Sequence, residues 1–526
     1  MSTIYLDYAA STPVDPRVAA AMCECLSNPD AQGNPASATH GPGLAASDRV
    51  EAARAKVAAL IGATPREIIF TSGATEANNL AVLGVARAAR RAGAVHGHVL
   101  SSRTEHKSVL DTCKQLEKEG FAVTLVEPDD SGRVLPETVS ANLRADTLLV
   151  SLMLANNEIG VISDVAAIAE LCQARGVLMH TDASQAVGKL PVDVERLGVD
   201  FLSLTAHKFY GPKGIGALYV RERARPKIAP IQFGGGHERG LRSGTLPVHQ
   251  ILGLGVAAGI AMAEGSADAA HARDLASRLW RELETIPGIE FNGHREHRIP
   301  GLINLSFEGV EGESLITGLP GIAVSSGSAC SSATREPSYV LRSLGRTTEL
   351  AQSSLRLSLG RFTTAADVDE AATAIRAEVA RLRLLAGNTS VAEAMPADAS
   401  GDSLMARTLS PLTRRYFRAP ARVPQFPAGA LPSDVRQGRA GRVPDGTQVL
   451  FELKIADGIV KSARFSAYGC PHTVAVVSWV CEVLEGSRPD AGLLGTPADW
   501  ARKFDVPAEK LGRLLIVEDA LLAVFN

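Results

Sequence analysis

The sequence predicts an α/β fold with a large, mostly parallel sheet that helices cover on both faces. Between about residues 66 and 220, short runs rich in β-branched residues alternate with alanine-rich stretches of helical periodicity. This alternation is typical of parallel strands joined by crossover helices. A smaller α+β unit is expected to follow, because a helical stretch over 247–286 precedes INLSF and the helical stretch DVDEAATAIRAEVARLRLL.

The strands of the large unit are predicted from short apolar runs. They are EIIF, HVLSS, AVTLV, TLLVSLML, VLMHTDA, FLSLTA and GALYV. The intervening segments EANNLAVLGVARAARRAG and EHKSVLDTCKQLEKEG have helical periodicity. In such sheets ligands bind beyond the carboxyl ends of the strands, so the residues that follow these strands are the first candidates for a site.

A second domain is predicted after a linker. We place the first domain at residues 1–388, a polar, proline-punctuated linker at 389–404 and the second domain at 405–526. The arginine- and proline-rich stretch that opens the second domain has little periodicity. After it, QVLFELKI and IVKSARFSAY alternate like a hairpin, and helices are expected through TVAVVSWVCEVLEG and KLGRLLIVEDALLAVF.

The bulk composition indicates a cytoplasmic globular protein. Hydrophobic residues make up 45% and charged residues 21% of 526 residues, and a net charge of -3 gives no reason to expect nucleic acid or an anionic membrane as partner. Seven cysteines without paired spacing indicate reduced thiols. The start MSTIYLDYAA has no signal pattern, and the apolar stretch ILGLGVAAGIAM is expected to be too short to span a bilayer.

Lys208 is the central candidate for chemistry. It lies in FLSLTAHKFYGPKGIGALYV, where an apolar run ends at His207 and Lys208. Burial at a strand end pushes a lysine towards its neutral, nucleophilic form, whereas a lysine that extends to the surface is the ordinary alternative. Three other segments favour the reactive alternative.

These segments are suited to a phosphate and to an aromatic ring with a basic nitrogen. TSGATEANN follows a strand and opens a helix, so the amides of Ala74 and Thr75 can face an anion, with a simple helix cap as the alternative. Asp182 ends VLMHTDA and suits a protonated pyridine nitrogen, or else caps the next turn. His106 follows another strand and can stack on a ring, or be structural.

Four further side chains can donate to the same group. Gln185 and Asn157 are placed to meet a ring oxygen, and Thr205 and His207 flank the lysine closely enough to meet a phosphate. Each can also be an ordinary turn residue. Taken together, the residues indicate pyridoxal phosphate bound to Lys208.

Cys330 is the predicted reactive thiol. It lies in AVSSGSACSSA, between a short strand and EPSYVLRSLG, among serine, glycine and alanine. This setting differs from that of Cys172 and Cys113, which fall on apolar helix faces and are expected to be inert. A thiol on a flexible arm can visit a cofactor and then reach a second protein.

Over roughly residues 3–385 the chain resembles the NifS/IscS-type cysteine desulfurases, which belong to the class-V aminotransferase family and have PLP fold type I. The motifs that carry the resemblance are YLDYAASTPVDPRV, TSGATEANN, TEHKSVLDTC, NNEIG, HTDASQAVGKLP, HKFYGPKGIGALYV, GGGHERGLRSGTLPVHQ, SSGSACSSA and SLRLSLGRFTT. The resemblance implies that Lys208 carries pyridoxal 5'-phosphate as a Schiff base, that Asp182 pairs with its ring nitrogen and that His106 stacks on its ring.

The resemblance also implies the rest of the site. Asn157 and Gln185 would contact the ring oxygen. The phosphate contacts would be Ala74, Thr75, Thr205, His207 and Thr245 of a second subunit, which implies a homodimer. Arg356, in SLRLSLG, would bind the substrate carboxylate, and Asn34 is assigned nearby.

The implied reaction converts L-cysteine to L-alanine and leaves a persulfide on Cys330. The sulfur would pass to scaffold or other acceptor proteins for iron–sulfur clusters or other sulfur-containing cofactors. A selenocysteine lyase on the same fold is the nearest alternative. A non-catalytic sulfur-relay protein is another, although such a protein is expected to lack Lys208 or Cys330, and both are present.

The second domain resembles IscU/NifU-type iron–sulfur scaffolds, but it is poor in ligands. Of the expected ligand positions only Cys470, in YGCPHTVA, holds a thiol; the other positions hold Asp445, Thr447, Gly512 and Arg513. Cys481 falls on a helix and His472 has no spacing partner. We therefore predict no firm metal site, with Cys330 and Cys470 as the thiols that could contact a cluster or sulfur.

Two roles for the second domain stay open at this point. It is either a degenerate scaffold that accepts sulfur on Cys470 or docks partners, or a structural unit that blocks or steers the Cys330 loop. A group of arginines is interpreted as solvated charge on a linker, with nucleic-acid binding as the alternative. These are the arginines at positions 414, 415, 418, 422, 436, 439 and 442.

Overall fold

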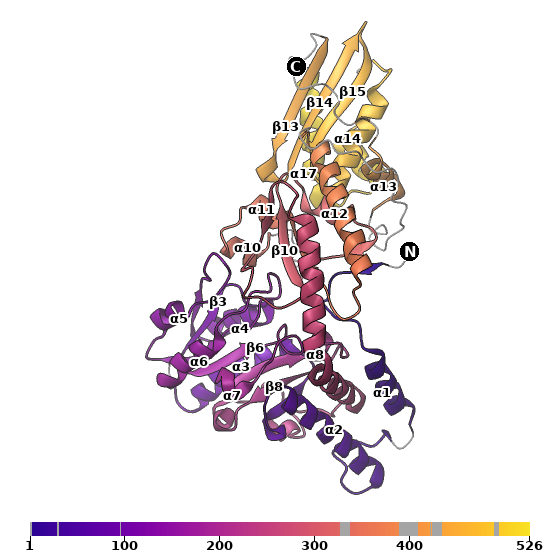
Figure 1. The fold of residues 1–526 in the computed structure, drawn as a ribbon. Coiled ribbons are helices and arrows are strands. Elements are labelled where there is room, and N and C mark those ends of the chain that lie inside the picture. Colours follow the sequence, from indigo (N-terminus) through magenta and orange to yellow (C-terminus); the bar gives the residue numbers. More distant parts are fainter. Residues whose placement is uncertain are drawn as a thin grey trace.

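The computed structural model describes residues 3–28, 31–94, 96–326, 337–388, 409–420, 422, 434–488 and 494–525. Figure 1 shows three units stacked one above another: a large α/β unit, a small α+β unit and a C-terminal unit. The long helix α8 (Val248–Leu283) runs from the large unit to the small one.

The large unit contains a seven-stranded sheet in the order β2-β8-β7-β6-β5-β3-β4. Only β8 runs antiparallel to its neighbours, so the predicted, mostly parallel sheet is confirmed. The strands are β2 (Ile68–Thr71), β3 (His98–Ser102), β4 (Ala122–Val126), β5 (Thr147–Ser151), β6 (Leu178–Asp182), β7 (Phe201–Thr205) and β8 (Gly216–Val220).

Both faces of this sheet are buried, which explains why its strands are apolar without alternation. Neighbouring residues of one strand belong to different cores: Val99 lies in one apolar cluster and Leu100 in the other. The helices that follow strands are α3 (Ala74–Arg91), α4 (Lys107–Lys118), α5 (Pro136–Asn142), α6 (Val165–Ala174) and α7 (Val194–Leu197). Helices α1 (Pro16–Ser27) and α2 (Gly41–Leu60) lie along α8.

Helix α8 is longer than its most apolar stretch indicated. Among the described residues it is the one helix long and apolar enough, by length and composition, to cross a membrane. The stretch ILGLGVAAGIAM is only part of this helix, whose length agrees with the helical stretch predicted over 247–286. The helix packs on α1, α2, β10 and α12, as the core helix of a folded protein does.

The described part of the small unit is an antiparallel sheet flanked by three short helices and one long helix, α12. Its strand order is β12-β10-β9, with β9 (Ile289–Phe291), β10 (Leu302–Phe307) and β12 (Ser354–Ser358). Strand β1 (Ile4–Tyr5) returns to pair with β11 (Ile322–Ala323), which places the chain's first residues against the small unit. The helices are α9 (Gly312–Thr317), α10 (Tyr339–Ser343), α11 (Thr348–Gln352) and α12 (Ala365–Leu385).

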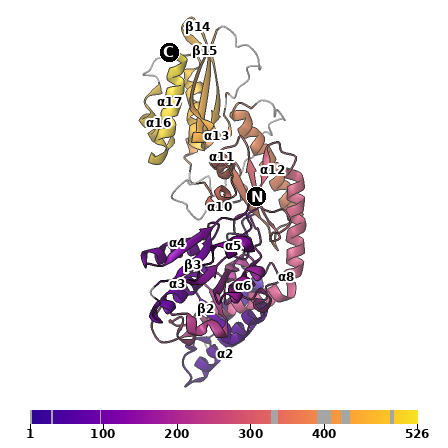
Figure 2. The ribbon, with the colours of Figure 1, turned by 90° about the vertical axis from the view of Figure 1, so that its left-hand side faces the viewer.

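The C-terminal unit is a three-stranded antiparallel sheet with helices packed against it. The predicted hairpin is confirmed as β14 (Thr447–Ala456) and β15 (Ile459–Tyr468). Its helices are α13 (Pro411–Arg418), α14 (Pro471–Leu484), α16 (Pro497–Phe504) and α17 (Leu511–Phe525). Helices α16 and α17 lie on one side of the sheet (Figure 2), where α17 contacts β13 and β14.

Strand β13 (Val435–Arg442) corrects the prediction of an irregular arginine-rich stretch. A Cβ at Gly438 would lie 2.2 Å from the carbonyl oxygen of Ala520, so a glycine stands where α17 covers the strand. Because a glycine stands at this buried position, β13 lacks the alternation of apolar and polar residues that predicts a strand. The arginines assigned to a linker lie partly in regular elements: three on α13 and three on β13, with Arg442 paired to Asp445 at 2.8 Å.

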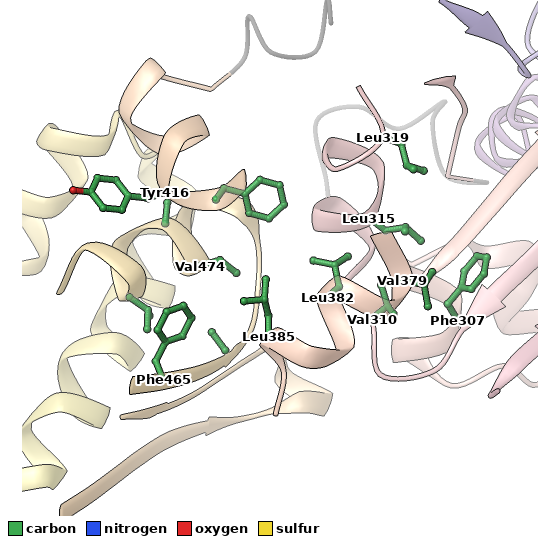
Figure 3. Packing of buried hydrophobic residues seen from close by; sticks show 14 of the residues in the cluster. Phe307, Val310, Leu315, Leu319, Val379, Leu382, Leu385, Tyr416, Phe465 and Val474 are labelled. Carbon is green, nitrogen blue, oxygen red and sulfur yellow. The ribbon is translucent and has the colours of Figure 1, made fainter. Parts of the chain in front are cut away.

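The C-terminal unit shares one apolar core with the small unit (Figure 3). Leu382 and Leu385 of α12 lie between Val310 on one side and Phe465 on the other. Polar contacts cross the same boundary, and Ser314 Oγ donates to the carbonyl of Gly469 at 2.8 Å. The predicted boundary and linker at 389–404 lie outside the described residues.

Candidate active site

Lys208 lies in a short 3₁₀ turn directly after β7, at the carboxyl end of that strand. Its Nζ donates to the carbonyl of Ala9 at 2.6 Å and to that of Ala10 at 2.9 Å. The neighbouring His207 lies 3.4 Å from Ser11 Oγ through its Nδ1. Burial, together with the charge of Lys208, lowers the pKa of His207 to about 4, so its ring is neutral near pH 7.

The backbone at the start of α3 has the form of an anion cradle. Gly73, with φ 153° and ψ -179°, adopts a conformation that is essentially open only to glycine. A Cβ on Gly216 would lie 2.8 Å from the Cα of Gly73, so strand and helix approach closely. Thr205 Oγ1 lies 3.7 Å from the position of a Cβ on Gly73, which brings Thr205 to the same helix end as Ala74 and Thr75.

Asp182 ends β6 and His106 follows β3, with β5 between these strands, and the two residues share a hydrogen-bond network. Asp182 accepts from Asn78 Nδ2 at 2.7 Å and from the Ser184 amide at 2.9 Å. Asn78 also donates to Ser108 Oγ at 2.9 Å, and the Ser108 amide donates to His106 Nδ1 at 3.1 Å. Burial lowers the pKa of His106, and the charge of Lys208 lowers it further, so a neutral ring is available for stacking.

Gln185 shares an acceptor with Lys208. Its Nε2 donates to the Ala9 carbonyl at 2.8 Å, and its Oε1 accepts from Lys189 Nζ at 2.8 Å. Asn157 Oδ1 is buried and has no hydrogen-bond partner among the described residues. Because a buried polar atom without a partner is costly, Asn157 fits a site that a polar ligand completes.

Arg356 on β12 is buried and held from two sides. It donates to Asp7 Oδ1 at 2.8 Å through one terminal nitrogen and to the backbone carbonyl of Asn157 at 3.0 Å through the other. Its Nε is buried without a hydrogen-bond partner in the described part of the chain. A guanidinium with donor capacity to spare beside Asn157 suits a carboxylate ligand.

Asn34 and Thr245 lie in another part of the chain. Asn34 is exposed before α2 and accepts from the Ala36 amide at 2.9 Å. Its neighbours Pro35 and Ala36 line a hollow with His237 and Leu246, which flank the Thr245 segment. No hydrogen bond between described residues links Asn34 or Thr245 to Lys208 or Arg356 of the same chain.

Cys330 lies outside the described residues, so its predicted role stays a prediction. The described residues on either side are tied to the site. The Arg356 amide donates to the Ser325 carbonyl at 2.7 Å. Ser338 Oγ donates to Glu158 Oε2 at 2.5 Å, and the Tyr339 hydroxyl donates to the Glu105 carbonyl at 2.7 Å.

Four further residues that were not predicted from the sequence complete this site. Burial raises the pKa of Glu158 to about 7, and burial with the charges of Lys208 and Arg356 lowers that of Lys189 to about 7. Asp7 and Asn78 orient Arg356 and Asp182. In the sequence, the one indication of Asp7, Asn78, Glu158 and Lys189 is that each lies within a motif that carries the family resemblance.

Cys470 of the C-terminal unit is fully buried at the start of α14. Its Sγ lies 3.4 Å from Thr473 Oγ1, and the Arg513 side chain lies close enough for the two groups to interact electrostatically. Arg513 also lies 3.5 Å from Glu311 of the small unit. Among the described residues, no three His, Cys, Asp or Glu side chains converge as a metal site would require.

Thr447 and His472 form hydrogen bonds to other groups, and Cys481 lies farther along α14. Thr447 Oγ1 donates to the carbonyl of Gly446 at 2.8 Å. His472 lies 3.2 Å from Lys510 Nζ, which pairs with Glu313 at 2.5 Å. Cys481 is buried on α14, and burial raises the pKa of its thiol.

Comparison with known proteins agrees with this geometry. The family model described as Aminotransferase class-V matches residues 4–371. Cysteine desulfurase IscS of Aeromonas salmonicida is 56% identical over 380 residues, which is 72% of this chain and 93% of the relative. Cysteine desulfurase IscS of Escherichia coli is 53% identical over 380 residues, with the same coverage of 72% and 93%.

Solved structures agree with these relatives. A NifS-like protein has a TM-score of 0.65 at 37% identity and covers 71% of this chain and 98% of its own. DndA from Streptomyces lividans has a TM-score of 0.57 at 41% identity, with coverage of 67% and 99%. The family match ends before the C-terminal unit. The chain therefore belongs to the aminotransferase class-V family and, within it, to the pyridoxal phosphate-dependent enzymes of the cysteine desulfurase type.

Proposed function

We propose that this enzyme converts L-cysteine to L-alanine and transfers the sulfur to Cys330, from which acceptor proteins take it for iron–sulfur clusters or other sulfur-containing cofactors. The observation that carries the proposal is the grouping of the Lys208 amine, the Asp182 carboxylate and the Arg356 guanidinium at one edge of the sheet. Similarity to IscS of Aeromonas salmonicida supports the same conclusion.

The residues present fit pyridoxal phosphate. The amides of Ala74 and Thr75 and the side chains of Thr205 and His207 would hold its phosphate. Asp182, oriented by Asn78 and Ser184, would keep its ring nitrogen protonated. When bound, the cofactor supplies an electron sink for a carbanion at the substrate's α-carbon.

This chain's residues then bind the substrate and move its protons. Arg356 holds the carboxylate of L-cysteine, and Lys208 Nζ takes the α-proton. The Cys330 thiolate attacks the substrate sulfur, so that an S–S bond forms and the substrate's C–S bond breaks. The electron pair of the broken bond stays on the carbon fragment, which takes one proton at its β-carbon, regains the α-proton from Lys208 and leaves as L-alanine.

A homodimer is part of this proposal, because Thr245 of a second subunit would complete the phosphate site. Large apolar side chains are exposed near that segment and on the helices beside it: Phe233 is 71% exposed, Leu26 61% and Leu44 50%. Exposed apolar surface of this kind is typical of an interface. The cytosol is the proposed compartment, since the described cysteines are all free thiols.

For the C-terminal unit we propose a docked structural role, in which it steers access of acceptors to the desulfurase. Cys470 is fully buried and contacts Arg513 and Thr473, which favours this role over that of an open sulfur acceptor. Sulfur acceptance by Cys470 would require the unit to move away from Glu311 and Ser314.

The test is turnover of L-cysteine by the full chain loaded with cofactor. We expect alanine and, with a thiol reductant, sulfide in equal amounts, with a persulfide on Cys330 detected by mass spectrometry. Cys330→Ser should keep the cofactor's visible absorbance band and lose sulfide release. Lys208→Ala should lose the visible band that the cofactor shows when it is attached to Lys208. Full sulfide release by Cys330→Ser would disprove the persulfide step. Faster turnover of L-selenocysteine than of L-cysteine would instead identify a selenocysteine lyase.

A further inference from the structure

Lys189 is a half-buried lysine beside the proposed active site, and the reaction above assigns it no role. It stands four residues after Gln185, in the turn that follows β6, and its Nζ donates to Gln185 Oε1 at 2.8 Å. Gln185 Nε2 in turn donates to the carbonyl of Ala9 at 2.8 Å. That carbonyl also accepts from Lys208 Nζ at 2.6 Å, so one short chain of hydrogen bonds joins the two lysines.

This chain fixes both ends of the Gln185 amide. A glutamine amide has one carbonyl oxygen and two N–H donors. Lys189 occupies the oxygen and Ala9 takes one N–H. With the oxygen turned towards Lys189, the second N–H is the part of the amide that remains for a further acceptor, and Gln185 itself is buried.

The amine of Lys189 is held there without an acidic partner. No ion pair with a carboxylate involves Lys189 among the described residues, and the nearest charges that act on it are the cations Lys208 and Arg356. Burial and these two cations lower its pKa to about 7. A lysine in such a place costs stability, which argues for a use at the site rather than for a solvated surface charge.

We propose that Lys189 is a positioning residue, which turns the side-chain amide of Gln185 so that an N–H is presented to the ring oxygen of the bound cofactor. The proposal rests on the proposed function, because it needs pyridoxal phosphate at Lys208. Without the amine, the buried Oε1 of Gln185 would lack its donor, and the amide would be free to turn that oxygen towards the cofactor instead.

The test compares Lys189→Met with Lys114→Met, a matched change of an exposed lysine on α4 that pairs with Asp111. The full chain is loaded with pyridoxal phosphate, and its visible absorbance band is recorded over roughly pH 6 to 10. We measure the pH midpoint of the band and the dissociation constant of the cofactor.

We expect the pH midpoint of Lys189→Met to rise by about one unit, or about tenfold in the proton-binding constant. The reason is that loss of a donor to the ring oxygen destabilises the deprotonated form of the bound cofactor. The dissociation constant of the cofactor should rise roughly fivefold, the loss of about one hydrogen bond. Lys114→Met should change neither quantity, and Lys189→Arg, which keeps a donor, should restore both.

A midpoint and a dissociation constant that match wild type in Lys189→Met would overturn the role of Lys189 and leave the proposed function intact. Failure of the wild-type chain to develop the band at all would instead refute the proposed function. If Lys189→Met does not fold, Lys189→Gln keeps a neutral donor of similar length. The proposal then predicts a midpoint between those of wild type and of a Gln185→Ala variant, and it fails if Lys189→Gln shifts as far as Gln185→Ala.

Discussion

At the scale of single residues, the proposed site consists of side chains that are oriented by others. Asp182 is oriented by Asn78, and Arg356 by Asp7 and the backbone of Asn157. Such supporting contacts hold reactive groups in place before a ligand arrives, which is the main structural contribution to proximity and electrostatic catalysis. Two predictions belong to this scale.

Substitution of Arg356 should affect substrate binding before it affects chemistry. Arg356→Lys keeps the charge but loses the two-pronged geometry that fits a carboxylate, so KM for L-cysteine should rise roughly tenfold or more while kcat changes less. Steady-state kinetics measure this split. Arg376→Lys, an exposed arginine paired with Glu282, is the matched control and should behave as wild type. An unchanged KM in Arg356→Lys would contradict its assignment.

Glu158 should make the protein less stable as pH rises from about 4.5 to about 7. Burial raises its pKa from 4.5 to about 7, so in this window the folded protein binds a proton that the unfolded chain releases. The free energy of unfolding should therefore fall by roughly 1 kcal/mol per pH unit for this group. His180 and His207, whose pKa values burial lowers to about 4, act in the opposite direction.

The measurement that isolates Glu158 is the difference between wild type and Glu158→Gln in chemical unfolding at several pH values. Relative to wild type, Glu158→Gln should gain stability as pH rises through the window and level off above it. A constant difference across the window would show that Glu158 does not titrate there.

At the scale of elements, two glycines permit a backbone conformation or a close approach that a residue with a Cβ would disturb. Gly73 begins α3 in a conformation closed to other residues, and Gly438 lets α17 lie directly on β13. In the first case the restriction is on the backbone dihedrals, and in the second it is on space. The two substitutions therefore fail for different reasons.

Gly73→Ala should weaken both folding and cofactor binding. A Cβ there meets no atom closer than 3.7 Å, so the cost is backbone strain of about 1–3 kcal/mol and a displaced helix end. Thermal unfolding and cofactor titration measure the two effects. Gly41→Ala is the control, because Gly41 also begins a helix, has φ below zero and meets nothing within 4 Å.

Gly438→Ala should destabilise the C-terminal unit by about 1–3 kcal/mol, because its Cβ would lie 2.2 Å from the Ala520 carbonyl oxygen. Hydrogen exchange in β13 and α17 should rise. Gly512→Ala at the open side of α17, where nothing lies within 4 Å, is the control. Equal exchange in the two variants would contradict the packing described here.

At the scale of the whole molecule, the C-terminal unit and the small unit share a core, and ion pairs border the contact. Lys510 with Glu313 and Arg513 with Glu311 lie beside the buried Cys470. The burial of this thiol therefore depends on how the two units are docked.

Loss of a border ion pair should expose Cys470. In Lys510→Met we expect alkylation of Cys470 to be about tenfold faster, since a partly buried pair of this kind contributes on the order of 1 kcal/mol to docking. Mass spectrometry of a timed iodoacetamide reaction measures the rate, with the exposed Cys23 as internal standard. Lys461→Met, on the exposed side of β15, should leave the rate unchanged. Equal rates in the two variants would show that the border pair does not control access.

The order of the elements and the chemistry of the large unit could be predicted from the amino-acid sequence alone. Apolar runs predicted as strands end at Asp182 and at Lys208. Because parallel strands end at the same edge of a sheet, the sequence alone indicates that these two residues lie at one edge. The family followed from motifs in the same order. These features are local, so a reading of short segments was enough.

The contacts between separate parts of the chain could not be predicted in this way. The amide of Gln185 is shared between Lys189 and Ala9, Arg356 is held by Asp7, and β13 forms where glycines admit α17. Each of these contacts depends on how the backbone folds in space or on the room that a neighbouring element leaves. Neither quantity is written in the local pattern of a sequence, and this is why the burial of Cys470 between two units could not be foreseen.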